Sequence, residues 1–182
     1  MPRPAEPGRT ALLQAGAEVA ARTGLRGLSV NAVVAAAGMA KGTFYHHFSD
    51  RRSYVIALHR RYHDELTVTV LTVVAGLEPG RERLHLGLTA YLDGCLRTVG
   101  TKAFLAQSRT DTDLLEEVQA RNQVVAGLIT PDLTTMGWND PGAVAALVVA
   151  MAAEIALAEL YSGEPEPALR AALAALVDRK PG

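Results

Sequence analysis

The most constraining feature of this sequence is a stretch, residues 51–77, in which apolar side chains recur at helical spacing. Its apolar positions follow one another after three, four, four, four, three and four residues: Val55, Leu58, Tyr62, Leu66, Val70, Val73 and Leu77. Residues three and four apart share one face of an α-helix, so this stretch predicts a single long helix, with Asp50 as its N-cap. Leu and Ala dominate the composition and aromatic residues make up only 5%, which favours an all-α protein over a β-sandwich or barrel.

Helical periodicity and stop signals divide the chain into about nine helices, and no stretch shows a strand signal. The predicted helices cover about residues 9–23, 30–37, 41–48, 51–77, 82–99, 102–108, 111–129 or 113–129, 141–161 and 167–178. Asp140 followed by Pro141 is a typical helix start, whereas TPDLTTMGWND at residues 130–140 predicts a loop. The proline-rich residues 1–8 predict a disordered tail.

Residues 29–48 combine two short helices with a turn. Ser29 is a good N-cap for the first of them, Gly38 ends it, and residues 39–40 form the turn before the second. A longer helix followed by this arrangement predicts a helix-turn-helix, in which the last helix enters the DNA major groove.

The charge distribution supports a DNA-facing N-terminal part. Residues 1–63 hold nine Lys and Arg against three Asp and Glu, a net charge of +6, and the remainder holds nine against sixteen, a net charge of −7. A basic head on an acidic body indicates that the head meets a polyanion.

The segment AKGTFYHHFSDRR, residues 40–52, has the side chains that a groove-reading helix needs. Gly42 would let the backbone approach DNA closely, and Thr43 offers a hydroxyl and a methyl group to a base edge. Phosphate partners would be Tyr45, Lys41 and His47. Two aromatic residues four apart, Phe44 and Phe48, predict the opposite, buried side of this helix.

The segment at residues 23–58 resembles the DNA-binding domain of TetR-family transcriptional regulators. Its sequence is TGLRGLSVNAVVAAAGMAKGTFYHHFSDRRSYVIAL. The resemblance implies an all-α homodimer with a helix-turn-helix domain at residues 9–50 and a helical ligand-binding and dimerisation domain at residues 51–182. It also implies repression of an operator that a small molecule relieves. Carried over by position, the DNA contacts of the family fall on Ser29, Lys41, Gly42, Thr43, Tyr45, His47 and Arg51.

Two residues depart from the pattern of the family. Ala40 stands where a serine often caps the recognition helix, and the loss of such a cap costs about 1 kcal/mol. Arg51 replaces a frequent lysine, which keeps the charge and changes its geometry.

A ligand site is expected in the C-terminal helices. Tyr91, Phe104, Trp138 and Met151 could line a cavity or belong to a packed core. Asn122 and Glu154 are polar residues in helices that otherwise look buried, so each needs a partner, either a ligand or a neighbouring helix.

The run at residues 142–161 is apolar nearly all round. Its two glutamates, Glu154 and Glu159, favour a buried or interfacial helix over a membrane span. Together with the last helix, through Leu169, Leu173, Leu176 and Val177, it predicts a dimer face, which agrees with how the TetR family pairs.

Other side chains suggest no further chemistry. His59 and His63 have a spacing that can bind metal, but the segment HRRYHDE is interpreted as a solvated face, so neither a metal nor a cofactor is predicted. Cys95 is expected to be a small core residue. One cysteine and an N-terminus without an apolar core favour a cytoplasmic protein.

The sequence also leaves alternatives to a repressor released by a small molecule. The same fold could activate transcription or respond to a protein partner, or a helical interaction module could have lost DNA binding, which only Ala40 supports. A helical enzyme is disfavoured because no nucleophile–base pair, metal cluster or phosphate loop is visible.

Overall fold

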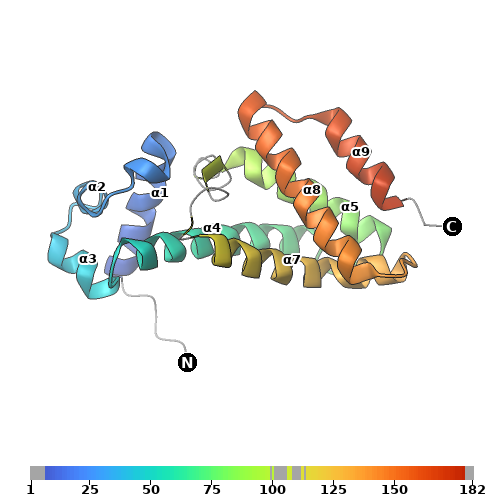
Figure 1. Cartoon of the computed structure of the whole chain (residues 1–182), viewed down its shortest axis with the longest axis horizontal. Coiled ribbons are helices and arrows are strands. Elements are labelled where there is room, and N and C mark those ends of the chain that lie inside the picture. Colours follow the sequence, from blue (N-terminus) through green and yellow to red (C-terminus); the bar gives the residue numbers. More distant parts are fainter. Residues whose placement is uncertain (1–6, 99, 101–105, 108–111, 113, 179–182) are drawn as a thin grey trace. The chain divides into compact units, whose positions relative to one another are not determined.

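The computed structural model describes residues 7–98, 100, 106–107, 112 and 114–178. Within these ranges the chain forms eight helices and no strand, which confirms the all-α prediction (Figure 1). The helices are α1 (Pro7–Gly27), α2 (Val30–Ala36), α3 (Lys41–His47), α4 (Arg51–Val73), α5 (Arg81–Arg97), α7 (Leu115–Thr135), α8 (Pro141–Ser162) and α9 (Pro167–Asp178). The predicted helix at 102–108 lies mostly outside the described residues, and its residues 106 and 107 are helical.

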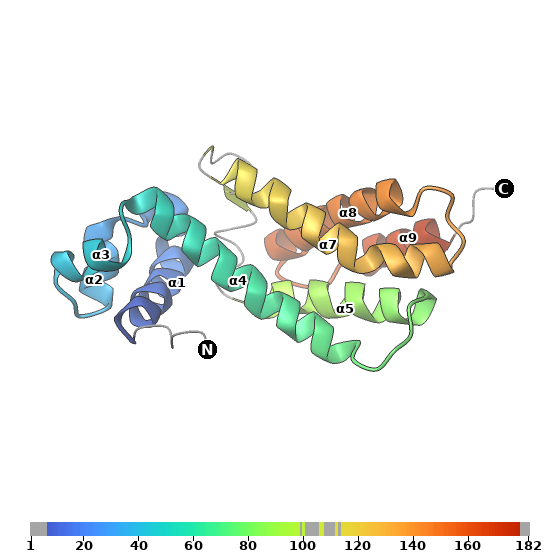
Figure 2. The ribbon, with the colours of Figure 1, turned by 90° about the horizontal axis from the view of Figure 1, so that it is seen from below.

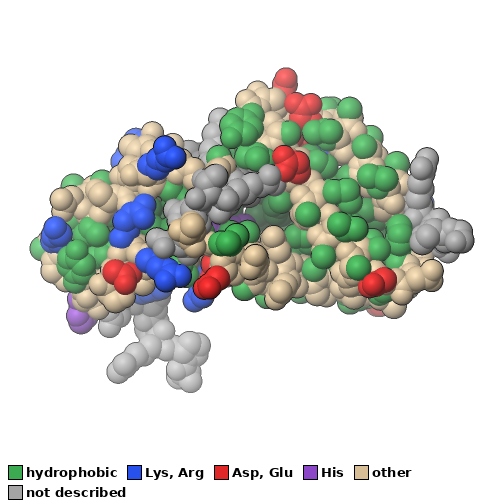
Figure 3. Space-filling model, viewed as in Figure 1, with side chains coloured by type: hydrophobic (Ala, Val, Ile, Leu, Met, Phe, Trp, Pro, Cys, Tyr) green, Lys and Arg blue, Asp and Glu red, His purple; other side chains and the backbone are tan. Residues whose placement is uncertain are grey.

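The chain divides into two compact units. The head unit contains residues 1–63 and 99–115, and the body unit contains residues 64–98 and 116–182. Figure 3 shows one face of the molecule, on which most of the Lys and Arg side chains lie over the head unit and most of the Asp and Glu side chains lie over the body unit.

In the head unit, α1, α2 and α3 pack together against the first turns of α4 (Figure 2). The closest approach is at Gly16 of α1, where a Cβ atom would lie 1.7 Å from Tyr54 Oη. That hydroxyl donates a hydrogen bond of 2.7 Å to the Leu12 carbonyl. Burial raises the pKa of Tyr54 above its ordinary value, so the side chain is a neutral core donor.

The core of the body unit lies where α5 and α9 pack against α8. Its buried side chains include Leu84, Leu92, Cys95, Val148, Ile155, Leu160, Leu173 and Val177. Cys95 is therefore a small core residue, as predicted.

Two buried ion pairs fasten this unit. Asp132 of α7 receives hydrogen bonds from Arg83 Nε at 2.6 Å, from Arg83 Nη2 at 2.8 Å and from the Gly80 amide at 2.8 Å. Because both carboxylate oxygens are used, the end of α7 is fixed to the start of α5.

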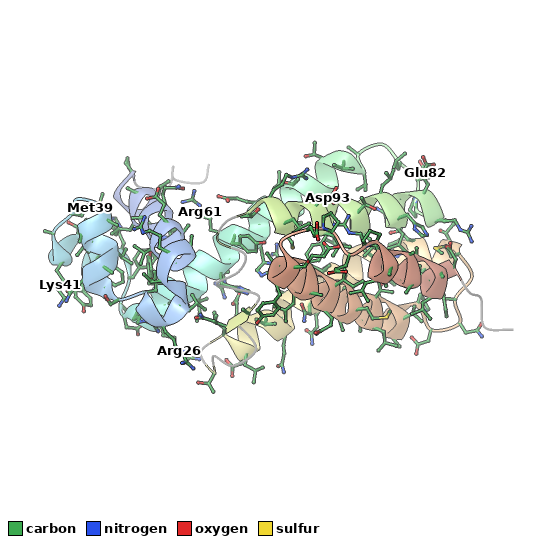
Figure 4. The ribbon with its side chains drawn as sticks, turned by 90° about the horizontal axis from the view of Figure 1, so that it is seen from above. Arg26, Met39, Lys41, Arg61, Glu82 and Asp93 are labelled. Atoms are coloured by element: carbon green, nitrogen blue, oxygen red, sulfur yellow. The ribbon has the colours of Figure 1, made fainter. Side chains whose placement is uncertain are left out.

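The second ion pair joins three helices. Glu159 of α8 is fully buried and accepts hydrogen bonds from Arg170 of α9, whose Nη1 also donates to Asp93 of α5 at 2.7 Å. Figure 4 shows Asp93 on the side of α5 that meets α8 and α9. Burial raises the pKa of Glu159, but the hydrogen bonds from Arg170 and from the Glu166 amide outweigh it, so the pKa lies below its ordinary value.

The ends of α4 and α7 differ from the predicted positions. The long helix α4 ends at Val73 instead of Leu77 because Gly76 adopts a left-handed conformation with φ of 80°. Val73, the last residue of α4, is exposed, whereas Val74, four residues after the half-buried Val70, is buried.

The predicted loop at 130–140 was also wrong, because α7 continues through Pro131 to Thr135. Pro131 leaves the carbonyl of Gly127 without its helical donor, and Gly127 is exposed, so water can replace that donor. The helix ends in a Schellman arrangement at Gly137, with Trp138 N donating to the Leu133 carbonyl.

The apolar helix α8 is the one described helix whose length and composition would allow it to cross a membrane. Of its most apolar window, 39% is buried inside the chain. Its inward side is a core surface of the body unit.

Candidate nucleic-acid interface

The helix-turn-helix predicted from the sequence is present in α2 and α3. Ser29 caps α2, since its Oγ accepts a hydrogen bond of 3.1 Å from the Ala32 amide. Gly38 has a φ of 63°, and Met39 N donates to the Val34 carbonyl at 2.9 Å. Gly38 therefore ends α2 as a left-handed cap and turns the chain toward α3.

The inner side of α3 is aromatic. Phe44 is fully buried, and its ring centroid lies 5.5 Å from that of Phe48 and 5.0 Å from that of Tyr54. The Phe48 ring lies 4.9 Å from Tyr54 on α4, and the Arg9 guanidinium of α1 lies 5.2 Å from its centroid. The predicted anchoring role of Phe44 and Phe48 is confirmed, and it fixes which side of α3 faces outward.

The outer side of α3 presents Lys41, Gly42 and Tyr45. Lys41 points away from the other helices of the head unit in Figure 4, and the Tyr45 side chain is 51% exposed. A Cβ atom on Gly42 would meet no described heavy atom within 4 Å. Folding therefore leaves room for a side chain at this position, although the residue is glycine.

Three other predicted DNA contacts differ in how exposed their side chains are. Ser29 is exposed, and Thr43 is half-buried. His47 is half-buried and lies against the start of α1, where a Cβ on Gly8 would be 2.8 Å from its Nε2. Ala40 precedes α3 without a side-chain cap.

Arg51 is engaged inside the head unit. Its Nε donates to the Leu28 carbonyl at 2.8 Å and its Nη2 donates to the Leu25 carbonyl at 2.7 Å. The neighbouring Asp50 caps α4 through the Ser53 amide at 2.7 Å, and this hydrogen bond lowers the pKa of Asp50. The sequence carries no signal for the two carbonyl contacts, since they join residues 23 and 26 positions apart.

The predicted ligand residues are distributed unevenly. Tyr91 of α5 and Met151 of α8 are half-buried, and so is Trp138. Asn122 of α7 and Glu154 of α8 are exposed, so the expectation that they are buried polar groups was wrong. Phe104 lies outside the described residues.

The histidine pair of α4 is also placed differently from the expectation. His59 is buried with 1% exposure, and its ring centroid lies 4.3 Å from that of His63. The interpretation of this segment as a solvated face was therefore wrong for His59. Within the described residues, no three His, Cys, Asp or Glu side chains form a group that could hold a metal ion.

Part of the head unit matches a known family profile. The profile described as bacterial regulatory proteins, tetR family, matches residues 12–58, which include α2, α3 and the first turns of α4. The match shows that residues 12–58 are similar to tetR-family regulatory proteins. A curated relative, the HTH-type transcriptional repressor KstR2 of Rhodococcus jostii (strain RHA1), is 29% identical over 122 residues. That match covers 59% of this chain, and the chain spans 60% of the length of that repressor.

Solved structures extend the similarity of fold to nearly the whole chain. A transcriptional regulator from Rhodococcus sp. Rha1 has a TM-score of 0.76 with 24% identity, covering 95% of this chain and 99% of that protein. The multidrug binding protein EbrR, in a complex with imidazole, has a TM-score of 0.75 with 19% identity, covering 99% of this chain and 98% of EbrR. At these identities the likeness shows the fold.

Proposed function

We propose that this chain is a homodimeric, cytoplasmic transcriptional regulator that represses a pseudo-palindromic operator until a small molecule binds. Residues 9–50 would read DNA, and residues 51–182 would dimerise and bind the effector. The observation that carries the proposal is the outer side of α3, where Lys41 and Tyr45 flank a glycine that folding does not require.

Four residues of α3 have a role in this proposal. Gly42 brings the helix backbone close to the floor of the major groove, where the Thr43 side chain can reach a base edge or a thymine methyl group. Lys41 and Tyr45 contact phosphates on either side, which positions the helix without specifying sequence.

Dimerisation is proposed for the outward faces of α8 and α9. The exposed apolar side chains there are Leu147, Tyr161, Leu169 and Leu176, with exposures of 63%, 76%, 42% and 50%. Leu173 and Val177, which the sequence suggested for the same face, are buried in the core of the body unit instead. A second copy of this surface would cover the exposed side chains and set two heads about 34–36 Å apart.

An effector site is proposed in the body unit. EbrR, which has the same fold, is complexed with imidazole, and the half-buried Tyr91 and Met151 offer apolar surface of the kind that small ligands contact. Release of DNA requires only that the effector favour a dimer in which the distance between the two head units does not match the distance between the operator half-sites. A coupling of about 1–3 kcal/mol changes operator affinity 5–150-fold.

The test begins with selection of a preferred duplex from a random-sequence library, followed by anisotropy titrations of that duplex and a scrambled one. The expected result is tighter binding of the selected duplex, with an affinity that falls steeply with salt because counterions are released. Lys41→Ala should weaken both duplexes and reduce the log–log salt slope by about one unit. Absence of selection, or binding that ignores salt, would rule out a DNA-binding regulator and favour an interaction module.

A further inference from the structure

Arg51, the first residue of α4, links that helix to the junction between α1 and α2. Two nitrogens on one edge of its guanidinium donate to two carbonyls, Nε to Leu28 and Nη2 to Leu25, at 2.8 and 2.7 Å. Such a fork satisfies two acceptors at once in a fixed plane, which a single ammonium nitrogen does less well.

The two carbonyls belong to a tightly folded part of the chain. Gly24 breaks the helical geometry of α1 with a φ of 68°, and Leu25 and Leu28 are both buried with 1% exposure. The Leu25 carbonyl also accepts a hydrogen bond of 3.2 Å from the Leu28 amide, and a carbonyl oxygen has a second lone pair for another donor. The half-buried Arg51 side chain supplies that donor, and it holds the chain one residue before Ser29, the N-cap of α2.

The next turn of α4 makes contacts that hold the rest of the head. Tyr54 donates from its hydroxyl to Leu12 of α1, while its ring packs against Phe44 in α3 and against Phe48, the C-cap of α3. Arg51 thus holds the entrance to α2, and Tyr54 holds α1 and α3.

From these contacts we infer that Arg51 is a positioning residue, which fixes the α2–α3 pair on α4 and thereby sets how α3 enters the groove. Its role is not that of the phosphate contact that the family pattern implies. The inference rests on the proposed DNA-binding function, and it assigns the specificity of the head partly to a residue that does not touch a base.

Arg51→Lys separates the two roles because it keeps the charge and removes the fork. A phosphate contact tolerates this exchange, whereas a positioning contact does not. We expect about a tenfold loss of affinity for the selected duplex, equivalent to the loss of one charged hydrogen bond, with unchanged affinity for the scrambled duplex. The salt slope of both should stay the same, since the number of cations at the interface is unchanged.

Arg61→Lys is the matched control. Arg61 also extends from α4 to α1, where it donates to the Thr10 carbonyl at 3.2 Å and to Gln14 Oε1 at 3.3 Å, away from the α1–α2 junction. Its replacement should leave the ratio of selected to scrambled affinity unchanged. All titrations are made well below the melting temperature of each variant, so a loss caused by unfolding is excluded.

A second measurement does not depend on DNA. In the full-length protein labelled with ¹⁵N, the Arg51 Nε–H resonance should exchange slowly with water and should not shift when either duplex binds. Protection without any DNA selectivity would support the Arg51 contacts and reject the proposed function instead. An unprotected Nε–H, a shift with either duplex, or an Arg51→Lys protein with wild-type selectivity would each overturn the positioning role. If the lysine variant fails to fold, the resonance of the wild-type protein decides.

Discussion

Adding one methyl group to Gly42 should weaken DNA binding while leaving the head folded. The structure offers the added Cβ open space, with no described heavy atom within 4 Å. In the free protein, Gly42→Ala should therefore be neutral or slightly stabilising, by up to about 1 kcal/mol, because alanine loses less backbone entropy in a helix.

In the complex the same methyl group would stand between the helix backbone and the groove. The new carbon projects about 1.5 Å from Cα, and a hydrogen bond near 2.9 Å is lost when its atoms separate beyond about 3.5 Å. A retreat of α3 by about 1 Å therefore removes contacts to base edges. Each such contact contributes about 1–3 kcal/mol, so affinity for the selected duplex should fall about 5–150-fold.

Gly127→Ala provides a matched control, since Gly127 is also an exposed helical glycine whose Cβ would meet no described atom within 4 Å. It lies in α7, in the body unit. The assay combines thermal melts with anisotropy titrations of both variants. Wild-type affinity in Gly42→Ala, or an equal loss in Gly127→Ala, would refute the close approach of α3 to DNA.

Leu147→Glu should dissociate the dimer in sedimentation at several concentrations, because Leu147 is 63% exposed and lies on the proposed interface. Val148→Glu should instead lower the melting temperature, because Val148 is buried with 1% exposure. A dimeric Leu147→Glu protein would contradict the proposed interface. Stability should depend on Glu159 at acid pH. Its pKa in the folded protein lies below the ordinary 4.5, so its contribution is full above that pH and is lost as the pH falls through the folded value; acid titrations of Glu159→Gln, which lacks this dependence, provide the comparison. Gly16→Ala should destabilise the head by about 1–3 kcal/mol, because its Cβ would collide with the Tyr54 hydroxyl, and denaturant melts that match wild type would contradict this close packing.

The sequence alone was sufficient to predict most of the helices and the residues that cap them. Ser29, Asp50 and Asp140 each accept a hydrogen bond from an amide three residues later, and Pro167–Asp178 forms the helix expected there. The spacing of Phe44 and Phe48, four residues apart, predicted the buried side of α3. All these features depend on residues within a few positions of one another, so local spacing is sufficient to predict them.

Only the tertiary structure decided which long-range partner each side chain meets. Asp132 finds Arg83 at a separation of 49 residues, and α7 continues past Pro131 to that contact although the local sequence indicates a loop. The sequence pattern places Arg51 among the DNA contacts, whereas its hydrogen bonds to the Leu25 and Leu28 carbonyls depend on how α4 packs against the α1–α2 junction. On α8, which is apolar nearly all round, spacing could not distinguish the exposed Leu147 from the buried Val148. The physical reason is that burial depends on which face another helix covers, and a residue pattern that is apolar on every side carries no information about that choice.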